Sequence, residues 1–534
     1  MAAAEAAGAE LLLLGAKHDA QGSRSGAGCG FHFVAPPSGH RSRRHHLPCG
    51  TYAGRMRGPA ASAALVTVLL AGCQASGVNA PQPLSPGSST ARSSPSSPAS
   101  RSATSPPSPT EHPMPLALVV NITRPTADVA VVDARRVVAS GATRWPAIGQ
   151  PGGQMRVLTT KNRRANEVLR AVRTSPNVLG IVPADAVDTR VRVLTVGGRH
   201  PLRDPQRYPL RTQSVRPVPE ITTLAAVGDI MLGRRVGDRH RADPGASLKP
   251  LAKRLAAAEI TVGNFESTLS TAGSPTQGGD SFAASPRVTS GLRAAGFDLL
   301  SLANNHAGDY GDRALRQTLA RFAKAKIDTV GAGHDLAAAR RPVIMERDGV
   351  RVGFLAVDSI GETPAATPTR AGTNRLNMPP RTGPLNRAAL RRITSDIRAL
   401  DKRVDVVIVL THWGTQYTHR PESSQRLASR AFADAGADLV IGGHPHWVQG
   451  WEMADSAVVV HSLGNFVFDM DFQTKTREGI FLEIVLWGGK VKAVEPVPYL
   501  IDSTFTPRLI RGDRAQRILT DVWRTSRGPF ALPS

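Results

Sequence analysis

Residues 439 to 446 read Leu-Val-Ile-Gly-Gly-His-Pro-His, an apolar run that ends in two histidines flanking a proline. A short apolar run bounded by turn residues predicts a buried strand, and the histidines follow at its C-terminal end. Because proline restricts the backbone between them, we expect both imidazoles to project toward one site. This stretch therefore predicts a strand that delivers two nitrogen ligands to a metal or catalytic centre.

Five further stretches repeat the pattern of an apolar strand that runs into a short polar loop. Most of these stretches are followed by a helical segment, so the pattern predicts an α/β domain with parallel strands. Ligands bind such sheets at the C-terminal ends of the strands. A lone polar residue there is more often a turn or cap residue than a ligand, but six stretches in register favour a common site. The five stretches with their end residues are 224–229 (Asp229), 260–266 (Asn264, Glu266), 299–306 (Asn304, Asn305, His306), 406–414 (His412) and 458–465 (Asn465).

The same motifs resemble a known family. They are Gly-Asp-Ile-Met-Leu-Gly at 228–233, Gly-Asn-Phe-Glu at 263–266, Ala-Asn-Asn-His at 303–306, His-Trp-Gly at 412–414, His-Pro-His at 444–446 and Ser-Leu-Gly-Asn-Phe at 462–466. Together they resemble the CapA family of poly-γ-glutamate capsule proteins, which is related in fold to calcineurin-type metallophosphoesterases. The resemblance implies a metallophosphoesterase-like four-layer α/β/β/α domain over residues 221–510. The sequence itself predicts a closing hairpin at 480–487 and 491–498, and a C-terminal helix and tail at 511–534.

The resemblance also implies a metal centre. Carboxylate, amide and imidazole groups suit a borderline divalent metal such as Mn, Fe or Zn, present as one or two ions. Two departures from the phosphoesterase pattern bear on the number of ions. Met231 stands where the phosphoesterases have a histidine, and Asn264 or Glu266 takes the place of the bridging aspartate, Glu266 being the better anionic ligand. The metal ligands that the resemblance implies are Asp229, Glu266, Asn305, His412, His444 and His446.

The implied activity is metal-dependent hydrolysis or transfer on an anionic polymer such as poly-γ-glutamate. Asp229 and His306 are the expected catalytic residues, with His306 as general acid; the alternative for His306 is a supporting hydrogen-bonded role. Two other functions stay open. The first is binding or retention of polymer without catalysis, which Met231 favours, and the second is metal-dependent phosphodiester hydrolysis, as in a metallophosphodiesterase. The residues expected to contact substrate are Asn264, Asn304, Tyr417, Arg420 and Asn465, with a solvated loop as the alternative for Tyr417 and Arg420.

An export signal precedes these domains. The apolar run 60–71 follows a short basic start and ends in Leu-Ala-Gly-Cys73, which resembles a bacterial lipoprotein signal over residues 56–73 with Cys73 as the lipidated residue. The alternative is a chance match in alanine-rich sequence. We expect an extracytoplasmic protein held at the cell membrane by its lipid anchor. The partners expected there are poly-γ-glutamate and other capsule-synthesis membrane proteins.

Composition divides the rest of the chain. Residues 1–55 are either disordered or an extension before the true start, and 74–114 form a Ser/Pro-rich linker that cannot bury a core. Residues 115–212 alternate short strands and helices and are similar to part of a periplasmic solute-binding protein. Because only one lobe's worth of sequence is present, a spacer or docking module is the alternative to ligand binding there.

Charge and cysteine content narrow the chemistry. The formal net charge of +24 favours acidic partners, but the sequence has no compact Lys/Arg run with interleaved aromatic residues, so nucleic-acid binding is not expected. All three cysteines precede residue 74. Disulfides and cysteine-ligated zinc are therefore excluded from the downstream domains.

Overall fold

The computed structural model describes residues 111–533. The predicted lipoprotein signal at 56–73, its Cys73 and most of the predicted linker lie outside the described residues. Within 111–533, none of the helices is both long enough and apolar enough to cross a lipid bilayer.

Residues 111–217 form a small five-stranded sheet with a helix on each face. Leu118 and Val120 of the central strand pack with one helix, whereas Ala117 and Val119 pack with the other, because successive strand residues point to opposite faces. The elements, in the strand order β2-β3-β1-β4 with β5 beside β1, are β1 (Glu111–Asn121), β2 (Arg156–Thr159), β3 (Val178–Pro183), β4 (Val191–Val193), β5 (Arg211–Pro217), α1 (Val131–Ser140) and α2 (Ala165–Thr174).

An eight-stranded sheet begins the main domain. Its strands β6 to β9 run parallel to one another, and β19 pairs antiparallel with β6. The order is β21-β20-β19-β6-β7-β8-β9, with β18 also beside β6. The bounds are β6 (Ile221–Ile230), β7 (Ile260–Phe265), β8 (Phe297–Ser301), β9 (Asp328–Val330), β18 (Asn465–Val467), β19 (Glu478–Trp487), β20 (Lys490–Ile501) and β21 (Pro507–Leu509).

The second sheet of the main domain has six strands. Its order is β11-β12-β14-β15-β17-β16, and β12, β14, β15 and β17 are parallel, with an antiparallel strand at each edge. The bounds are β11 (Val343–Arg347), β12 (Val350–Asp358), β14 (Val406–His412), β15 (Leu439–Gly443), β16 (Trp451–Ala454) and β17 (Ala457–Val460).

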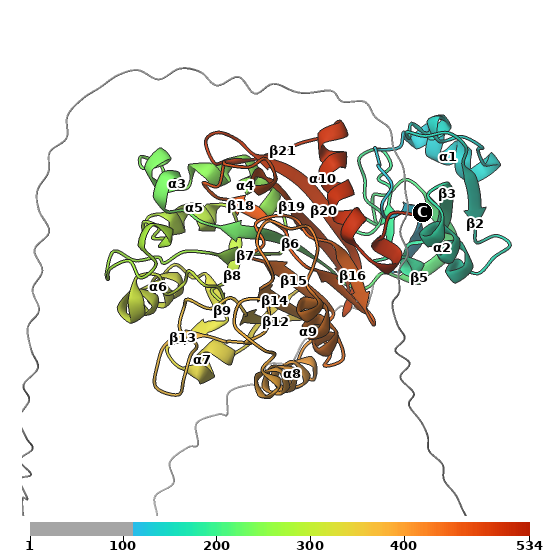
Figure 1. The fold of residues 1–534 in the computed structure, drawn as a ribbon. Coiled ribbons are helices and arrows are strands. Elements are labelled where there is room, and N and C mark those ends of the chain that lie inside the picture. Colours follow the sequence, from blue (N-terminus) through green and yellow to red (C-terminus); the bar gives the residue numbers. More distant parts are fainter. Residues whose placement is uncertain (1–110, 534) are drawn as a thin grey trace, which may run out of the picture. The chain divides into compact units, whose positions relative to one another are not determined.

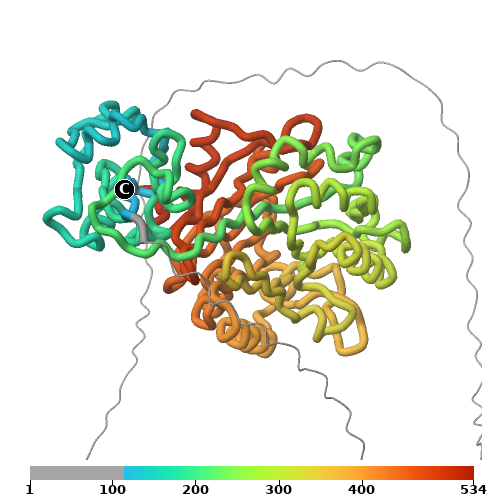
Figure 2. The backbone as a smooth tube through the Cα atoms, turned by 180° about the vertical axis from the view of Figure 1, so that it is seen from behind, coloured from blue at the N-terminus to red at the C-terminus, as the bar shows by residue number. Residues whose placement is uncertain are grey.

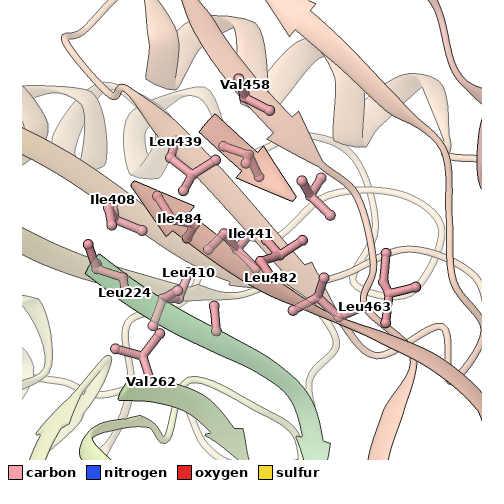
Figure 3. Close-up of a cluster of buried hydrophobic side chains, with 14 of the residues drawn as sticks. Leu224, Val262, Ile408, Leu410, Leu439, Ile441, Val458, Leu463, Leu482 and Ile484 are labelled. Carbon is pink, nitrogen blue, oxygen red and sulfur yellow. The ribbon is translucent and has the colours of Figure 1, made fainter. Parts of the chain in front are cut away.

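The two sheets pack face to face, and helices cover their outer faces (Figures 1 and 2). Leu224 and Leu482 of the first sheet meet Ile408 and Ile441 of the second in one core (Figure 3). The predicted four-layer α/β/β/α order is therefore confirmed. The covering helices are α4 (Lys249–Leu255), α5 (Val288–Ala294) and α6 (Gly311–Lys324) on the first sheet, and α8 (Arg387–Asp401) and α9 (Ser423–Ala433) on the second.

The C-terminal elements join the same core. The predicted hairpin is present as β19 and β20, and the predicted C-terminal helix is α10 (Gly512–Thr525), whose Trp523 packs edge-to-face against Trp451. The hairpin also packs against the small domain. Its Trp487 lies in the core of that domain and donates from Nε1 to the Leu202 carbonyl at 2.8 Å.

The strands of the six stretches predicted as parallel are confirmed as parallel within their two sheets, and the antiparallel β19 lies beside β6. The stretch 458–465, predicted as a strand that runs into a polar loop, contains the end of β17, which stops at Val460 in one sheet. The loop then crosses to the other sheet, where β18 begins at Asn465. Gly464 lies in this crossing and has φ 73, a conformation that glycine adopts readily, and its carbonyl accepts from the Asp229 amide at 3.1 Å. Finally, β1 begins at Glu111, inside the predicted linker.

Candidate metal centre

Strands from both sheets end at one place, where most of the predicted site residues lie. Near the end of β6, Asp229 is the register partner of Asn264 on β7. His412 ends β14 beside Gly443 of β15, and His444 follows. The two sheets meet where the His444 amide donates to Asp229 Oδ2 at 3.1 Å. Parallel pairing within each sheet and hydrogen bonds between the sheets thus assemble residues that are far apart in sequence.

Asp229, Glu266 and His446 form a compact group of potential ligands. Each offers one ligand atom, and the three atoms lie within 4.8 Å of one another. All three side chains are buried, with exposed fractions of 0 to 1%. Buried carboxylates are costly unless a cation or hydrogen-bond donors compensate them. Two carboxylates and one imidazole at this spacing match the donor set of a borderline divalent metal.

His412 and two asparagines extend this group. His412 Nε2 is 2.9 Å from Asn305 Oδ1 and 3.8 Å from Glu266 Oε1. The Asn264 amide nitrogen lies 2.8 Å from Asp229 Oδ1, 3.3 Å from Glu266 Oε2 and 3.2 Å from His412 Nδ1. The Asn264 amide therefore contacts three of the candidate metal ligands and holds them close to one another.

Buried polar atoms without a hydrogen-bond partner indicate whether these residues could hold a metal ion. Within residues 111–533, Glu266 Oε1 and both ring nitrogens of His444 are buried without a hydrogen-bond partner. Each such group costs about 1–3 kcal/mol if nothing satisfies it. The His444 ring lies 4.9 Å from that of His412 and 5.8 Å from that of His446, centroid to centroid. An ion among these side chains would supply the missing partners, so the residues present fit a divalent metal.

The backbone is held in an uncommon conformation at the same place. His444 has φ 92 and His446 has φ 58, in the region that non-glycine residues rarely adopt. Such conformations persist where surrounding structure imposes them, and they cluster at functional sites. Both imidazoles reach the site from this strained turn.

Burial dominates the electrostatics of the group. It raises the pKa of Asp229 to about 6 and, together with the charges of Asp229 and Asp309, raises that of Glu266 well above its usual range. It also lowers the pKa of His446 to about 4 and that of His412 well below the usual value, the neighbouring histidines adding to the effect. The imidazoles are therefore neutral and available as ligands at pH 7, and a cation would favour the ionised carboxylates.

His306 lies beside this group. Its Nε2 is 3.8 Å from Glu266 Oε1, and its Nδ1 is 2.7 Å from Asp309 Oδ2. The ring also stacks on Phe282, with centroids 3.8 Å apart. Asp309 and Phe282 lie outside the motifs from which the site was predicted. A carboxylate three residues after the Asn-His pair was the one available signal for Asp309, and no sequence pattern pointed to Phe282.

Two predicted substrate contacts are corrected. Asn304 is fully buried, and its amide donates to Asn264 Oδ1 and to the Phe265 carbonyl, both at 2.9 Å. Asn465 is also fully buried, and its Oδ1 accepts from His446 Nδ1 at 2.8 Å. Because their amides are used inside the protein, both residues support the site rather than face a substrate.

The remaining predicted residues differ in their placement. Tyr417 is half-buried, and its ring stacks at 6.0 Å from that of His446, so it lies beside the candidate ligands. Arg420 is exposed, and its backbone amide donates to Thr418 Oγ1. Met231 is fully buried, and its sulfur accepts from the Gly233 amide at 3.1 Å. The Met231 thioether is thus occupied within its own loop.

Comparison with known proteins identifies the family. The model of the bacterial capsule synthesis protein PGA_cap family matches residues 223–470. The capsule biosynthesis protein CapA of Bacillus anthracis is 31% identical over 303 residues, which are 55% of this chain and 72% of that protein. The chain belongs to this family. The PGA biosynthesis protein CapA of Bacillus subtilis (strain 168) is also 31% identical, with 55% of this chain and 75% of that protein covered.

The PGA_cap match includes every candidate metal ligand from Asp229 to His446, whereas the small domain at 111–217 lies before it. Among solved structures, a hypothetical protein from Thermus thermophilus aligns with 52% of this chain and 99% of its own, at 16% identity and a TM-score of 0.34. A likeness of that strength adds nothing to the assignment, which rests on the PGA_cap relatives.

Proposed function

We propose that this PGA_cap protein is a metal-dependent hydrolase or transferase that acts on an anionic polymer of the poly-γ-glutamate type in capsule synthesis. The observation that carries the proposal is the convergence of Asp229, Glu266 and His446 within 4.8 Å. The names of the two CapA relatives support the choice of polymer. The net charge of +24 supports an acidic substrate.

The ion or ions would be Mn, Fe or Zn. A bound divalent metal supplies Lewis acidity, which makes water a nucleophile near neutral pH. The unpartnered atoms of Glu266 and His444 mark where the protein lacks a partner of its own. The buried Met231 sulfur, which accepts from a backbone amide, leaves fewer ligands for a second ion. The residues that would hold the metal are Asp229, Glu266, Asn305, His412, His444 and His446.

His306 is the proposed general acid. Asp309 accepts from Nδ1, which directs Nε2 toward the candidate ligands, 3.8 Å from Glu266 Oε1. A proton on Nε2 would then be positioned for transfer to a leaving group. Phe282 covers one side of the ring and limits its rotation.

The location and partners belong to the same proposal. We place the protein outside the cytoplasm, held at the cell membrane by a lipid on Cys73 and acting with other capsule-synthesis membrane proteins. The Leu-Ala-Gly-Cys73 sequence supports the anchor. Acylation of Cys73 is tested by labelling cells with a fatty-acid analogue, where Cys73→Ala should remove the label.

A non-catalytic polymer-binding protein is the second candidate, and Met231 favours it because a motif histidine is absent. Metal-dependent turnover distinguishes the two. Purified protein is incubated with poly-γ-glutamate, with and without chelator, and the polymer length is followed by gel filtration. Asp229→Asn should abolish chelator-sensitive cleavage, while the exposed control Asp238→Asn should not. If the protein binds the polymer but does not cleave it with Mn, with Fe or with Zn, the enzymatic function is excluded.

A further inference from the structure

Arg234 occupies a constrained position beside the candidate metal centre. It begins α3 (Arg234–Arg239) directly after Gly233, and its φ is 42. A Cβ at Gly233 would lie 2.5 Å from the Ala283 carbonyl oxygen, so only glycine allows this approach. The close contact places the Arg234 guanidinium over the Phe282 ring, 4.3 Å from its centre.

Phe282 connects Arg234 to the site. The same ring stacks on His306 at 3.8 Å, so the guanidinium and the proposed general acid contact one phenyl group. The positive charge of Arg234 also contributes to lowering the pKa of His446 and opposes the rise at Glu266. Its electrostatic influence therefore extends to ligands from both sheets.

One edge of the guanidinium is fixed and the other is open. Nε lies 3.1 Å from Asp469 Oδ2, and Nη2 bonds the other oxygen of this carboxylate, which is only 2% exposed. Nη1 is 3.8 Å from Asp280, whose side chain is 85% exposed, a separation too long for a direct hydrogen bond. A buried carboxylate thus orients Arg234 and leaves Nη1 available to a ligand.

We propose that Arg234 binds a carboxylate of the polymer next to the bond acted on, and so selects a substrate with an acidic group in its repeating unit. This inference rests on the proposed function of the site and specifies its substrate class. Arginine suits the role because its planar fork can hold Asp469 on one edge and a second carboxylate on another. Arg234 does not take part in the bond change and acts as a specificity residue.

The neighbouring Arg235 lacks this arrangement. Arg235 pairs with the exposed Asp471 at 2.6 Å and lies over Phe505, away from Phe282. It differs from Arg234 by one position and provides a matched control. Its replacement removes the same charge from the same helix without touching the Phe282 ring.

The test is a binding measurement with two probes, a short oligomer of γ-linked glutamate and the same oligomer with its α-carboxyls converted to amides. We expect Arg234→Gln to weaken binding of the acidic oligomer by about tenfold to a hundredfold, the value of one charge-assisted hydrogen-bonded contact. The amide oligomer should bind equally to the wild-type protein and to Arg234→Gln. Arg235→Gln should leave the preference for the acidic probe unchanged.

A second variant protects the test against misfolding, because Arg234→Gln leaves the Asp469 carboxylate without its partner. Asp280→Asn removes an exposed negative charge 3.8 Å from Nη1 that repels an incoming carboxylate, and it should tighten binding of the acidic oligomer by about twofold to fivefold. The proposal is overturned if Asp280→Asn and Arg234→Gln both bind like the wild type, or if both probes lose affinity equally. Metal content is measured on the same samples, so failure of the metal centre is seen separately from failure of Arg234.

Discussion

Asp309 Oδ2 accepts from His306 Nδ1 at 2.7 Å, and the same oxygen accepts from the Phe282 amide at 2.6 Å. One buried carboxylate oxygen therefore fixes both the imidazole and the residue whose ring stacks on it. This arrangement holds the Nδ1 proton of His306 against Asp309 and turns Nε2, the nitrogen that would carry the transferred proton, toward Glu266.

Asp309→Asn should reduce turnover by about tenfold to a hundredfold, because an amide can still bond the ring but does not stabilise its charged form. Metal content should not change, since His306 is not among the proposed ligands. The pH profile of turnover should shift as well, an effect that a purely structural role would not produce. Asp312→Asn is the control, because Asp312 pairs with Arg316 on the surface. Equal rates for Asp309→Asn and wild type would remove the proposed role of His306 as a positioned acid.

Asn465→Ala should weaken metal affinity by about tenfold to a hundredfold, because His446 loses the acceptor that orients its ring. Asn465→Asp keeps an acceptor at the same place and should retain the metal better than alanine does. Affinity is measured by competition with a chromophoric chelator. If the two variants bind metal equally while both remain folded, His446 is not a ligand oriented by Asn465.

Asp309 and Asn465 show which parts of the site could be predicted from the sequence and which could not. Hydrophobic runs and their polar ends predicted β6, β7, β14 and β15, because parallel strands place their last residues at one edge. The supporting role of Asn465 was missed, since a strand-end amide looks the same whether it faces solvent or a histidine. Phe282 and Asp469 were missed because ordinary loop residues become part of a site only through tertiary packing. The antiparallel insertion of β19 is likewise set by packing with β6, which no local pattern records.

Glu495 gives the protein a predicted acid-sensitive step. Although burial opposes ionisation, the charges of His200, Arg203 and Arg192 lower its pKa to about 2. The folded-state pKa lies below the ordinary value, so the stabilisation is complete above about pH 4.5 and is lost as the pH falls toward 2. The shift corresponds to at most about 3 kcal/mol.

Glu495→Gln should therefore flatten the dependence of the unfolding free energy on pH between about 4.5 and 2, as measured by urea titration. It should also destabilise the protein at pH 7, because His200 and Arg203 lose a partner at the contact between the small domain and β20. Glu346→Gln, at an exposed position, serves as the control. An unchanged slope in Glu495→Gln would show that another group causes the acid transition.

The proposed function depends on one metal centre built from both sheets. Its most direct test is the metal content of purified protein, by inductively coupled plasma mass spectrometry, in wild type, in the double variant His444→Ala/His446→Ala and in His419→Ala. His419 is the control because it bonds the Val448 carbonyl and is not a proposed ligand. We predict one or two equivalents of Mn, Fe or Zn in the wild type and in His419→Ala, and loss of most of that metal in the double variant. Equal metal in all three proteins would contradict the account.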